Sequence, residues 1–238
     1  MEIEYLVDGI FNSLFVLISL IICFYIVSRY FSLKKRDFLY VGIAWMGLVL
    51  SYIPHALSFL TFLIFNESLN QVIYLSFYGL IPITVIMWLI AMNHLLDAGK
   101  NIILILLSLI CISFLIIFYY FLIVNPNLLG EFIDKYHMHM QFTIFTRVFF
   151  ISMLTLFLLP GFLFSFRCFS SEKSEIRLKG KLLLLGFVSF GVGAFMTSNI
   201  DLTIIKVIAR SILLSSSIEF YCGYILPNWV KKLFLRSN

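Results

Sequence analysis

Three basic residues, Arg147, Lys206 and Arg210, lie inside long apolar runs of this chain. A charged side chain at the centre of an apolar span costs about 3 kcal/mol, so each of them is a candidate for function. Lys206 and Arg210 are four residues apart and therefore share one face of a helix. A guanidinium group binds a carboxylate or a phosphate with two parallel hydrogen bonds. These residues indicate a pocket for a small anionic ligand.

Two more side chains extend this candidate pocket. His55 lies at a similar depth in an earlier apolar run, and Tyr52 is one turn before it. In the alternative interpretation, the basic side chains reach the lipid headgroups or pair with loop carboxylates. The loop carboxylates in question are Glu131, Asp134 and Asp201. No carboxylate lies at matching depth in the two runs that hold the arginines, which favours an anion from outside over an internal pair.

A second polar group is expected at the other end of the last apolar run. Glu219 follows three consecutive serines there and is a candidate proton or cation site. In the alternative interpretation, Glu219 forms a structural hydrogen bond to Asn93 or His94, which ties the two helices together. Both interpretations stay open.

Metal and enzyme motifs are weak in this sequence. The loop run His137-Met138-His139-Met140 offers donors that copper accepts, but four adjacent residues cannot close a site alone. The four cysteines have no CxxC spacing and are expected to be buried, reduced thiols. There is no HExxH motif, no glycine-rich phosphate loop and no GxSxG. We therefore expect no metal, no cofactor and no enzymatic activity.

Composition places these residues in a membrane protein. The chain is 62% hydrophobic and 12% charged, whereas a soluble domain is about half apolar and a quarter charged. Long apolar runs favour helices over a β-barrel. We predict a single all-α domain, a bundle of seven transmembrane helices near residues 10–30, 38–62, 72–96, 102–124, 142–166, 182–197 and 202–226. An amphipathic tail over 228–238 is expected to form a short interfacial helix.

The remaining basic residues give the predicted helices a direction. One set of alternate gaps holds Arg29, Lys34, Lys35, Arg36, Lys100, Arg167, Lys173, Arg177, Lys179, Lys181, Lys231, Lys232 and Arg236, and the other set holds only Lys135. By the positive-inside rule, the first set is cytoplasmic. We therefore expect a multi-pass protein of the cell membrane, with its N-terminus outside and its C-terminus in the cytoplasm. The net charge of +5 then reflects topology and does not imply nucleic-acid binding.

Small residues and prolines predict how the helices pack. Gly186, Ser189 and Gly193 form a stripe that lets a neighbouring helix approach closely. Three prolines inside apolar runs are expected to kink their helices, namely Pro54, Pro82 and Pro160.

Two pairs of segments resemble a known family. The run FLYVGIAWMGLVLSYIPHAL is followed by IYLSFYGLIPITVIMWLIAMN, whose Tyr78-Gly79-x-x-Pro82 element resembles the third helix of the seven-helix N-terminal sensor region of prokaryotic histidine kinases. RLKGKLLLLGF and YCGYILPNWVKKLF are similar to stand-alone archaeal relatives of that region. The resemblance implies a sensing or signal-transmitting bundle whose output partner is another protein. The kinases continue into a catalytic core after the seventh helix, so we do not expect kinase activity here. The resemblance transfers no residue roles.

Our first hypothesis is a receptor-like sensor in the lipid bilayer. It binds an anionic ligand from the outer side and signals to a cytoplasmic protein. A transporter, or the substrate-binding membrane subunit of one, would use the same pocket. A structural subunit of a membrane complex is the third hypothesis.

Overall fold

The computed structural model describes residues 3–235 except 98, 100, 135 and 200–202. Four residues from the predicted topology and pairing, Lys100, Lys135, Asp201 and Arg236, lie outside the described residues. The first half of the chain forms α1 (Ile3–Leu33), α2 (Arg36–Leu50), α3 (Ile53–Phe65), α4 (Gln71–Gly79), α5 (Ile81–Leu95) and α6 (Asn101–Val124). The second half forms the 3₁₀ turn η1 (Pro126–Leu128), β1 (Gly130–Phe132), β2 (Met140–Phe142), α7 (Ile144–Phe169), α8 (Ser174–Asn199), α9 (Thr203–Ile225) and α10 (Asn228–Phe234).

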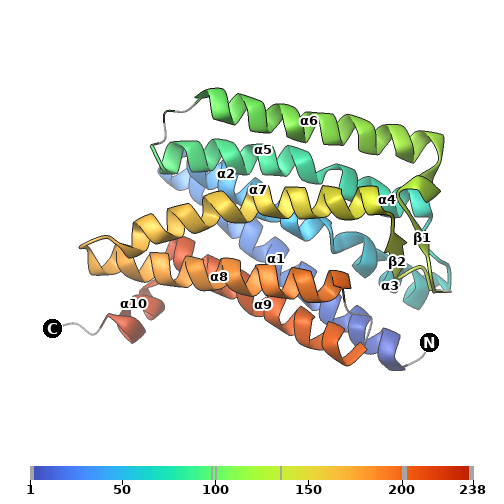
Figure 1. Cartoon of the computed structure of the whole chain (residues 1–238). Helices are drawn as coiled ribbons and strands as arrows, with labels where there is room; N and C mark the ends of the chain where they lie inside the picture. The colour runs from blue at the N-terminus through green and yellow to red at the C-terminus, as the bar shows by residue number, and fades with distance from the viewer. Residues whose placement is uncertain (1–2, 98, 100, 135, 200–202, 236–238) are drawn as a thin grey trace.

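The long helices run side by side in one bundle (Figure 1). Five helical segments of the described chain are long and apolar enough to cross a membrane: α1, α4 with α5, α6, α7 and α8. The pair α2 and α3, bent by 54° at a short break, gives a sixth. The expectation of a helical, multi-pass membrane protein is therefore confirmed.

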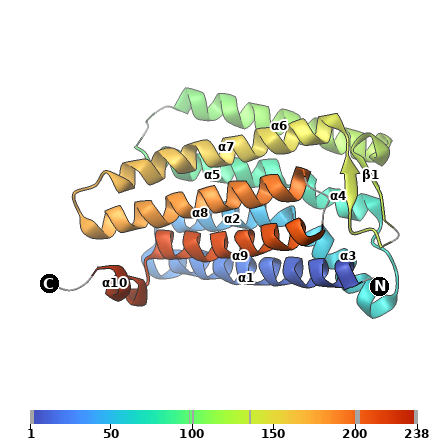
Figure 2. The same ribbon diagram turned by 60° about the horizontal axis from the view of Figure 1, so that its bottom comes forward.

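The predicted seventh span corresponds to α9. This helix is not among the candidate spans, although it covers 203–225 as expected. Lys206, Arg210 and Glu219 lie within it together with several serines, and charged residues weigh heavily against a span. It nevertheless packs along α1 and α8 (Figure 2). The seven-span topology and its orientation therefore stay predictions.

The two ends of the bundle differ chemically. We call the end that holds the N-terminus, the β1–β2 hairpin and the starts of α7 and α9 the polar end (Figure 1). The opposite end holds α10 and the α1–α2 and α7–α8 connections, and we call it the basic end. Lys34, Lys35, Lys173, Lys231 and Lys232 lie in these basic-end segments, as the sorting of the loops predicted.

Several element boundaries differ from the prediction. Helix α1 begins at Ile3 rather than near residue 10, so Asp8 lies inside a helix. Helix α8 begins at Ser174 rather than at 182, because the polar segment before its apolar run is also helical. The expected long loop after α6 contains the antiparallel β1–β2 hairpin, in which Glu131 pairs with Gln141. The short terminal helix is present as α10.

Stacked aromatic rings form the centre of the bundle. Trp45 of α2 stacks on Phe220 of α9 with ring centroids 3.9 Å apart, and Trp88 of α5 stacks on Phe157 of α7 at 4.5 Å. Phe187 of α8 contacts both Trp88 and Phe220 edge-on. Aromatic pairs in such arrangements contribute about 1 kcal/mol beyond the area they bury. Residues from five helices therefore share one aromatic core.

The three prolines lie at two kinds of position. Pro54 is in the first turn of α3, directly after the break that bends α2 against α3. Pro82 is in the first turn of α5, where α4 ends and α5 begins. Pro160 lies inside α7, which continues through it as one helix from Ile144 to Phe169. Only the first two coincide with a break between helices.

Helices α8 and α9 approach closely where glycines face the partner helix. A Cβ atom at Gly186 would lie 3.1 Å from the backbone nitrogen of Phe220, and one at Gly193 would lie 2.7 Å from Leu213. The close approach predicted from this stripe is confirmed. On α9, a Cβ atom at Gly223 would lie only 2.7 Å from the backbone nitrogen of Leu183. Backbone atoms cannot move aside as a side chain can.

Gly223→Ala should therefore force α8 and α9 apart. We expect a loss of about 1–3 kcal/mol in stability, measured as a lower unfolding temperature of the purified protein in detergent. Gly191→Ala is the matched control, since its Cβ would meet only the tip of Leu158; we expect it to change stability by no more than about 0.5 kcal/mol. Equal unfolding temperatures for the two variants would contradict the proposed packing.

Candidate functional site

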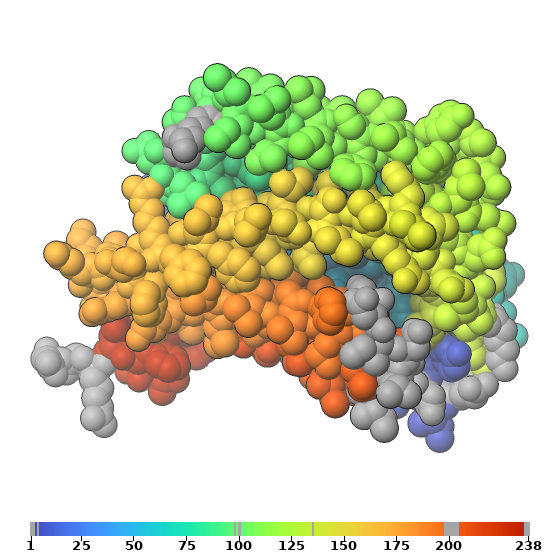
Figure 3. All heavy atoms as spheres, viewed as in Figure 1, coloured from blue at the N-terminus to red at the C-terminus, as the bar shows by residue number. Residues whose placement is uncertain are grey.

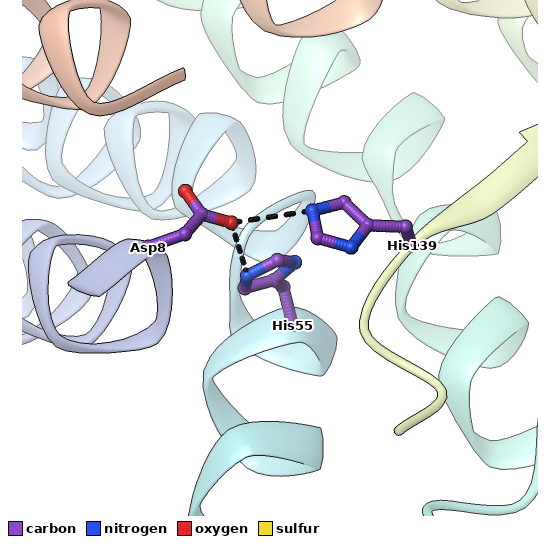
Figure 4. Close-up of side chains that lie close together, drawn as sticks. All are labelled: Asp8, His55 and His139. Atoms are coloured by element: carbon purple, nitrogen blue, oxygen red, sulfur yellow. Dashed lines mark ion pairs between the residues drawn. The ribbon is translucent and has the colours of Figure 1, made fainter. Parts of the chain in front are cut away.

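The polar end is built around one buried carboxylate, that of Asp8 on α1. Its side chain is 1% exposed. Its Oδ2 lies 3.0 Å from His55 Nε2 and 3.4 Å from His139 Nε2, and its Oδ1 lies 3.5 Å from Arg210 Nε. The two imidazoles approach Asp8 from α3 and from the loop before β2 (Figure 4). We call Asp8, His55, His139 and Arg210 the Asp8 cluster.

His55 reaches Asp8 because the chain breaks between α2 and α3. Tyr52 lies at this break, and His55 follows in the first turn of α3. Asn12, one turn after Asp8 on α1, donates a hydrogen bond from Nδ2 to the Tyr52 carbonyl oxygen at 2.9 Å. Asn12 and Asp8 lie on the same face of α1. Asn12 holds the break between α2 and α3, and Asp8 contacts His55, which follows this break.

His139 is oriented by a second carboxylate, that of Asp134. Asp134 Oδ1 accepts hydrogen bonds from the backbone N–H groups of Tyr136 and Met138 at 2.9 and 3.0 Å. Its Oδ2 accepts the His139 backbone N–H and lies 3.0 Å from His139 Nδ1. Because Asp134 holds Nδ1, the opposite ring nitrogen faces Asp8. The loop thus wraps around Asp134 and presents His139 to the bundle.

The Asp134–His139 contact shifts both pKa values. Burial alone would raise the pKa of Asp134, but the hydrogen bonds from His139 and from backbone N–H groups bring it below its ordinary value. Burial alone would lower the pKa of His139, but the hydrogen bond to Asp134 and the negative charge of Asp8 raise it above its ordinary value. The charged forms of both groups are stabilised by each other.

The basic side chains of α9 complete the cluster. The Arg210 guanidinium lies 5.0 Å above the centre of the Tyr52 ring, a cation–π geometry. Its Nη1 is buried and has no hydrogen-bond partner among the described residues. Lys206 is also buried, and its charge lowers the pKa of His139. Positive and negative groups therefore lie together in one buried region.

Aromatic rings separate the cluster from solvent. Tyr5 packs edge-on against Tyr136 and His139, with ring centroids 4.8 and 5.4 Å apart. Phe62 packs against Tyr136 at 4.8 Å, and Met138 is buried beside them. In such surroundings an ion pair interacts strongly, and an unpaired charge is expensive.

The structure brings together four of the five predicted ligand-pocket residues: Tyr52, His55, Lys206 and Arg210. The fifth, Arg147, is exposed on α7 and donates from Nε to the Phe142 carbonyl oxygen at 3.1 Å. Nothing in the described contacts joins it to the Asp8 cluster.

The sequence did not single out Asp8, and it offered His139 only as one of four adjacent loop donors that were not expected to form a metal site. The predicted first helix started after Asp8, and a carboxylate was sought only in the helices of the arginines. Because Arg210 has an internal partner on α1, the absence of a carboxylate no longer argues for an outside anion. The available signal was the Asp8–Asn12 spacing, which places two polar groups on one face of an apolar helix.

The structure bears on one of the two interpretations of Glu219, the structural tie. Glu219 Oε2 is buried and has no hydrogen-bond partner among the described residues. His94 Nδ1 instead lies 3.5 Å from Asp37 Oδ1 near the start of α2. A tie between Glu219 Oε2 and either Asn93 or His94 is therefore not formed.

The fold and the site define a helical membrane protein with a buried ionic cluster at one end. The chain matches no protein-family model and no curated protein sequence. Its resemblance to the sensor region of histidine kinases therefore stays a prediction.

Breaking the Asp8–Arg210 pair from one side should destabilise the protein. Asp8→Asn leaves the buried Arg210 charge without its carboxylate, and Arg210→Met leaves Asp8 with the two imidazoles alone. Removing one partner of a buried ion pair typically costs about 3 kcal/mol or more. The double variant should lose less than the sum of the two, with a coupling of at least about 1 kcal/mol. Unfolding of the purified protein in detergent measures all three values.

Arg147→Met is the matched control for this cycle, because Arg147 is an exposed arginine at the same end. We expect it to change stability by no more than about 0.5 kcal/mol. Additive losses for Asp8→Asn and Arg210→Met would show that the two charges do not interact.

Asp134→Ala should open the loop that carries His139. The change leaves the backbone N–H groups of Tyr136, Met138 and His139 without their acceptor. We expect the amides of these residues to exchange hydrogen about 10-fold faster, the equivalent of about 1.4 kcal/mol for the lost charge-assisted bonds. Glu131→Ala, at an exposed carboxylate of the same hairpin, should leave the rates unchanged. Equal hydrogen-exchange rates in the two variants would show that Asp134 does not hold the loop that carries His139.

Proposed function

We propose that the chain is a receptor-like sensor of the cell membrane, in which a ligand binds at the Asp8 cluster and the change in helix packing reaches a cytoplasmic partner. One observation carries the proposal: the cluster joins α1, α3, α9 and the hairpin loop at the polar end. Two of these helices, α1 and α9, run from the cluster to the basic end (Figure 2).

The proposed orientation follows from the basic residues. Basic residues concentrate in the α1–α2 and α7–α8 connections and in α10, and such segments stay on the cytoplasmic side. In this orientation the polar end and its hairpin face the outside. A ligand from outside then meets the Asp8 cluster first.

Direct contacts between α1 and its neighbours provide the route to the other end. Ser19 and Ser217 share a hydrogen bond of 2.7 Å between their hydroxyl oxygens. Closer to the basic end, the rings of Tyr25 and Tyr221 meet edge-on at 5.4 Å. A shift or rotation of α9 against α1 at the cluster therefore changes both contacts, as in the helix shifts of known switching proteins.

The basic end provides the proposed output surface. After α9 the chain turns at Leu226, whose φ is 54°, and Pro227 precedes α10. A groove of about 590 Å³ lies between this turn and α1, lined in part by Arg29 and Lys179. The Lys179 ammonium donates to the Tyr224 carbonyl oxygen at 3.1 Å. Movement of α9 would displace α10 and change the basic surface that a cytoplasmic protein meets.

A ligand can drive this change only if it binds the two arrangements with different affinity. The Asp8 cluster provides such a difference, because a ligand that binds Asp8 or Arg210 replaces a contact within the cluster. A small anion remains a candidate through Arg210 Nη1, and a cation through the two imidazoles. A transporter would use the same residues, and it differs from a sensor in carrying the ligand across.

Ligand addition outside should change hydrogen exchange at the basic end. We would reconstitute the protein in liposomes and add either zinc chloride or sodium phosphate as the outer probe. At least one probe should change the exchange of amides in the α7–α8 connection and α10. Arg210→Met should abolish the response to phosphate, and Arg147→Met, matched in chemistry, should keep it.

Accumulation of the effective probe inside the liposomes would contradict a pure sensor and favour the transporter. Unchanged exchange at the basic end with both probes, in protein that remains folded, would contradict the proposed signalling.

A further inference from the structure

Three ligand-type atoms at the polar end lie in ion-pair contact but form no hydrogen bonds to one another. Asp8 Oδ2, His55 Nε2 and His139 Nε2 lie within 4.8 Å of one another. All three atoms are buried, and none has a hydrogen-bond partner of acceptable geometry among the described residues. A buried polar atom without a partner costs about 1–3 kcal/mol. Three such atoms facing the same point indicate that a further group binds there.

Their spacing suits one metal ion. Zinc binds imidazole nitrogen and carboxylate oxygen at about 2.0–2.2 Å, so tetrahedral ligand atoms lie about 3.4 Å apart. Asp8 Oδ2 is 3.0 Å from His55 Nε2 and 3.4 Å from His139 Nε2. All three atoms lie within 4.8 Å of one another, so rotation of the side chains would bring them to this spacing around one ion.

The donor set selects the kind of ion. Two imidazoles and one carboxylate suit first-row transition metals, whereas Mg²⁺ and Ca²⁺ prefer oxygen ligands. The far nitrogen of His139 is held by Asp134 at 3.0 Å, the carboxylate–histidine arrangement that orients metal ligands. We propose that Asp8, His55 and His139 bind a divalent transition-metal ion of the Zn²⁺ class, with the fourth position open. As the ligand class of the sensor's own site, this proposal rests on the proposed function.

The neighbouring positive charges reduce the affinity of this site for a cation. A divalent cation lies close to Arg210 and Lys206 and is repelled by both. Asp134, behind His139, offsets part of this repulsion. Arg210 Nη1, buried and without a hydrogen-bond partner among the described residues, would in turn hold an anion in the open position. A metal ion with an anionic fourth ligand would therefore give partners both to the three ligand atoms and to Arg210 Nη1.

Metal binding would connect three parts of the chain that are far apart in sequence. Asp8 comes from α1, His55 from α3 and His139 from the hairpin loop. On one face of the molecule, a hollow opens between α7 and the polar end of α8, with blue-green atoms of the α2–α3 region at its floor (Figure 3).

The test is metal binding by the purified full-length chain in detergent, first stripped with a chelator. Calorimetry and metal analysis should show one Zn²⁺ per chain and no binding of Mg²⁺ at the same concentration. His55→Ala and His139→Ala should each weaken Zn²⁺ binding at least about 100-fold, since each removes one of three ligands, and Asp134→Asn should weaken it about 10-fold or more. His137→Ala should bind as the wild type does. His137 lies two residues from His139, but its ring stacks on Phe132 and its Nδ1 contacts the Leu69 carbonyl oxygen.

A second measurement needs no variant. Co²⁺ bound to the wild-type protein should show the intense visible bands of a four- or five-coordinate site with nitrogen and oxygen donors, and no thiolate charge-transfer band. A lack of Zn²⁺ binding to folded wild-type protein would overturn the proposal. So would wild-type affinity in folded His55→Ala and His139→Ala, or an equal loss in His137→Ala.

The metal site and the sensor can fail separately. Zn²⁺ binding that depends on His139 but leaves the basic end unchanged supports the site and contradicts the sensor. A response of the basic end to phosphate, without any Zn²⁺ binding, supports the sensor and overturns the metal site.

Discussion

A carboxylate buried in an apolar bundle must be neutralised, and the polar end of this protein is organised around that constraint. Asp8 is almost completely buried, and an uncompensated charge there would cost several kcal/mol. Arg210 faces one carboxylate oxygen, and His55 and His139 face the other. The side chains that neutralise Asp8 come from α9, α3 and the hairpin loop. Asp8 on α1 is therefore the common contact of three segments that are distant in sequence.

In each of these segments, a local structural feature places the side chain beside Asp8. The break between α2 and α3, fixed by Asn12 and followed by Pro54, presents His55. Asp134 wraps the loop before β2 and orients His139. The glycines that let α8 and α9 approach closely seat α9 in the bundle, where Arg210 lies over Tyr52. The chain continues from the end of α9 at Ile225 into α10 at the basic end.

Much of this architecture could be predicted from local pattern, because apolar runs and basic gaps report directly on helices and their ends. Arg210, Lys206, His55 and Tyr52 were found because a polar group in an apolar run is conspicuous. Asp8 was missed because an acidic N-terminal segment reads as a solvent-exposed start, and only its partners on α3 and α9 make its burial tolerable. His139 was noted only within the loop run 137–140 and set aside, because Asp8 and His55, which it meets, lie far away in sequence. Arg147 resembles Arg210 in sequence, but its position on α7 exposes it to the surface.

The central claim is that Asp8 lies inside the bundle, between the two imidazoles and Arg210. A cryo-electron microscopy structure in lipid nanodiscs, solved once with Zn²⁺ and once with a chelator, tests it most directly. The account predicts that Asp8 contacts His55, His139 and Arg210 in both states, with density for an ion between the two imidazoles only in the first. A structure in which Asp8 faces solvent or lipid, with Arg210 directed elsewhere, would contradict it.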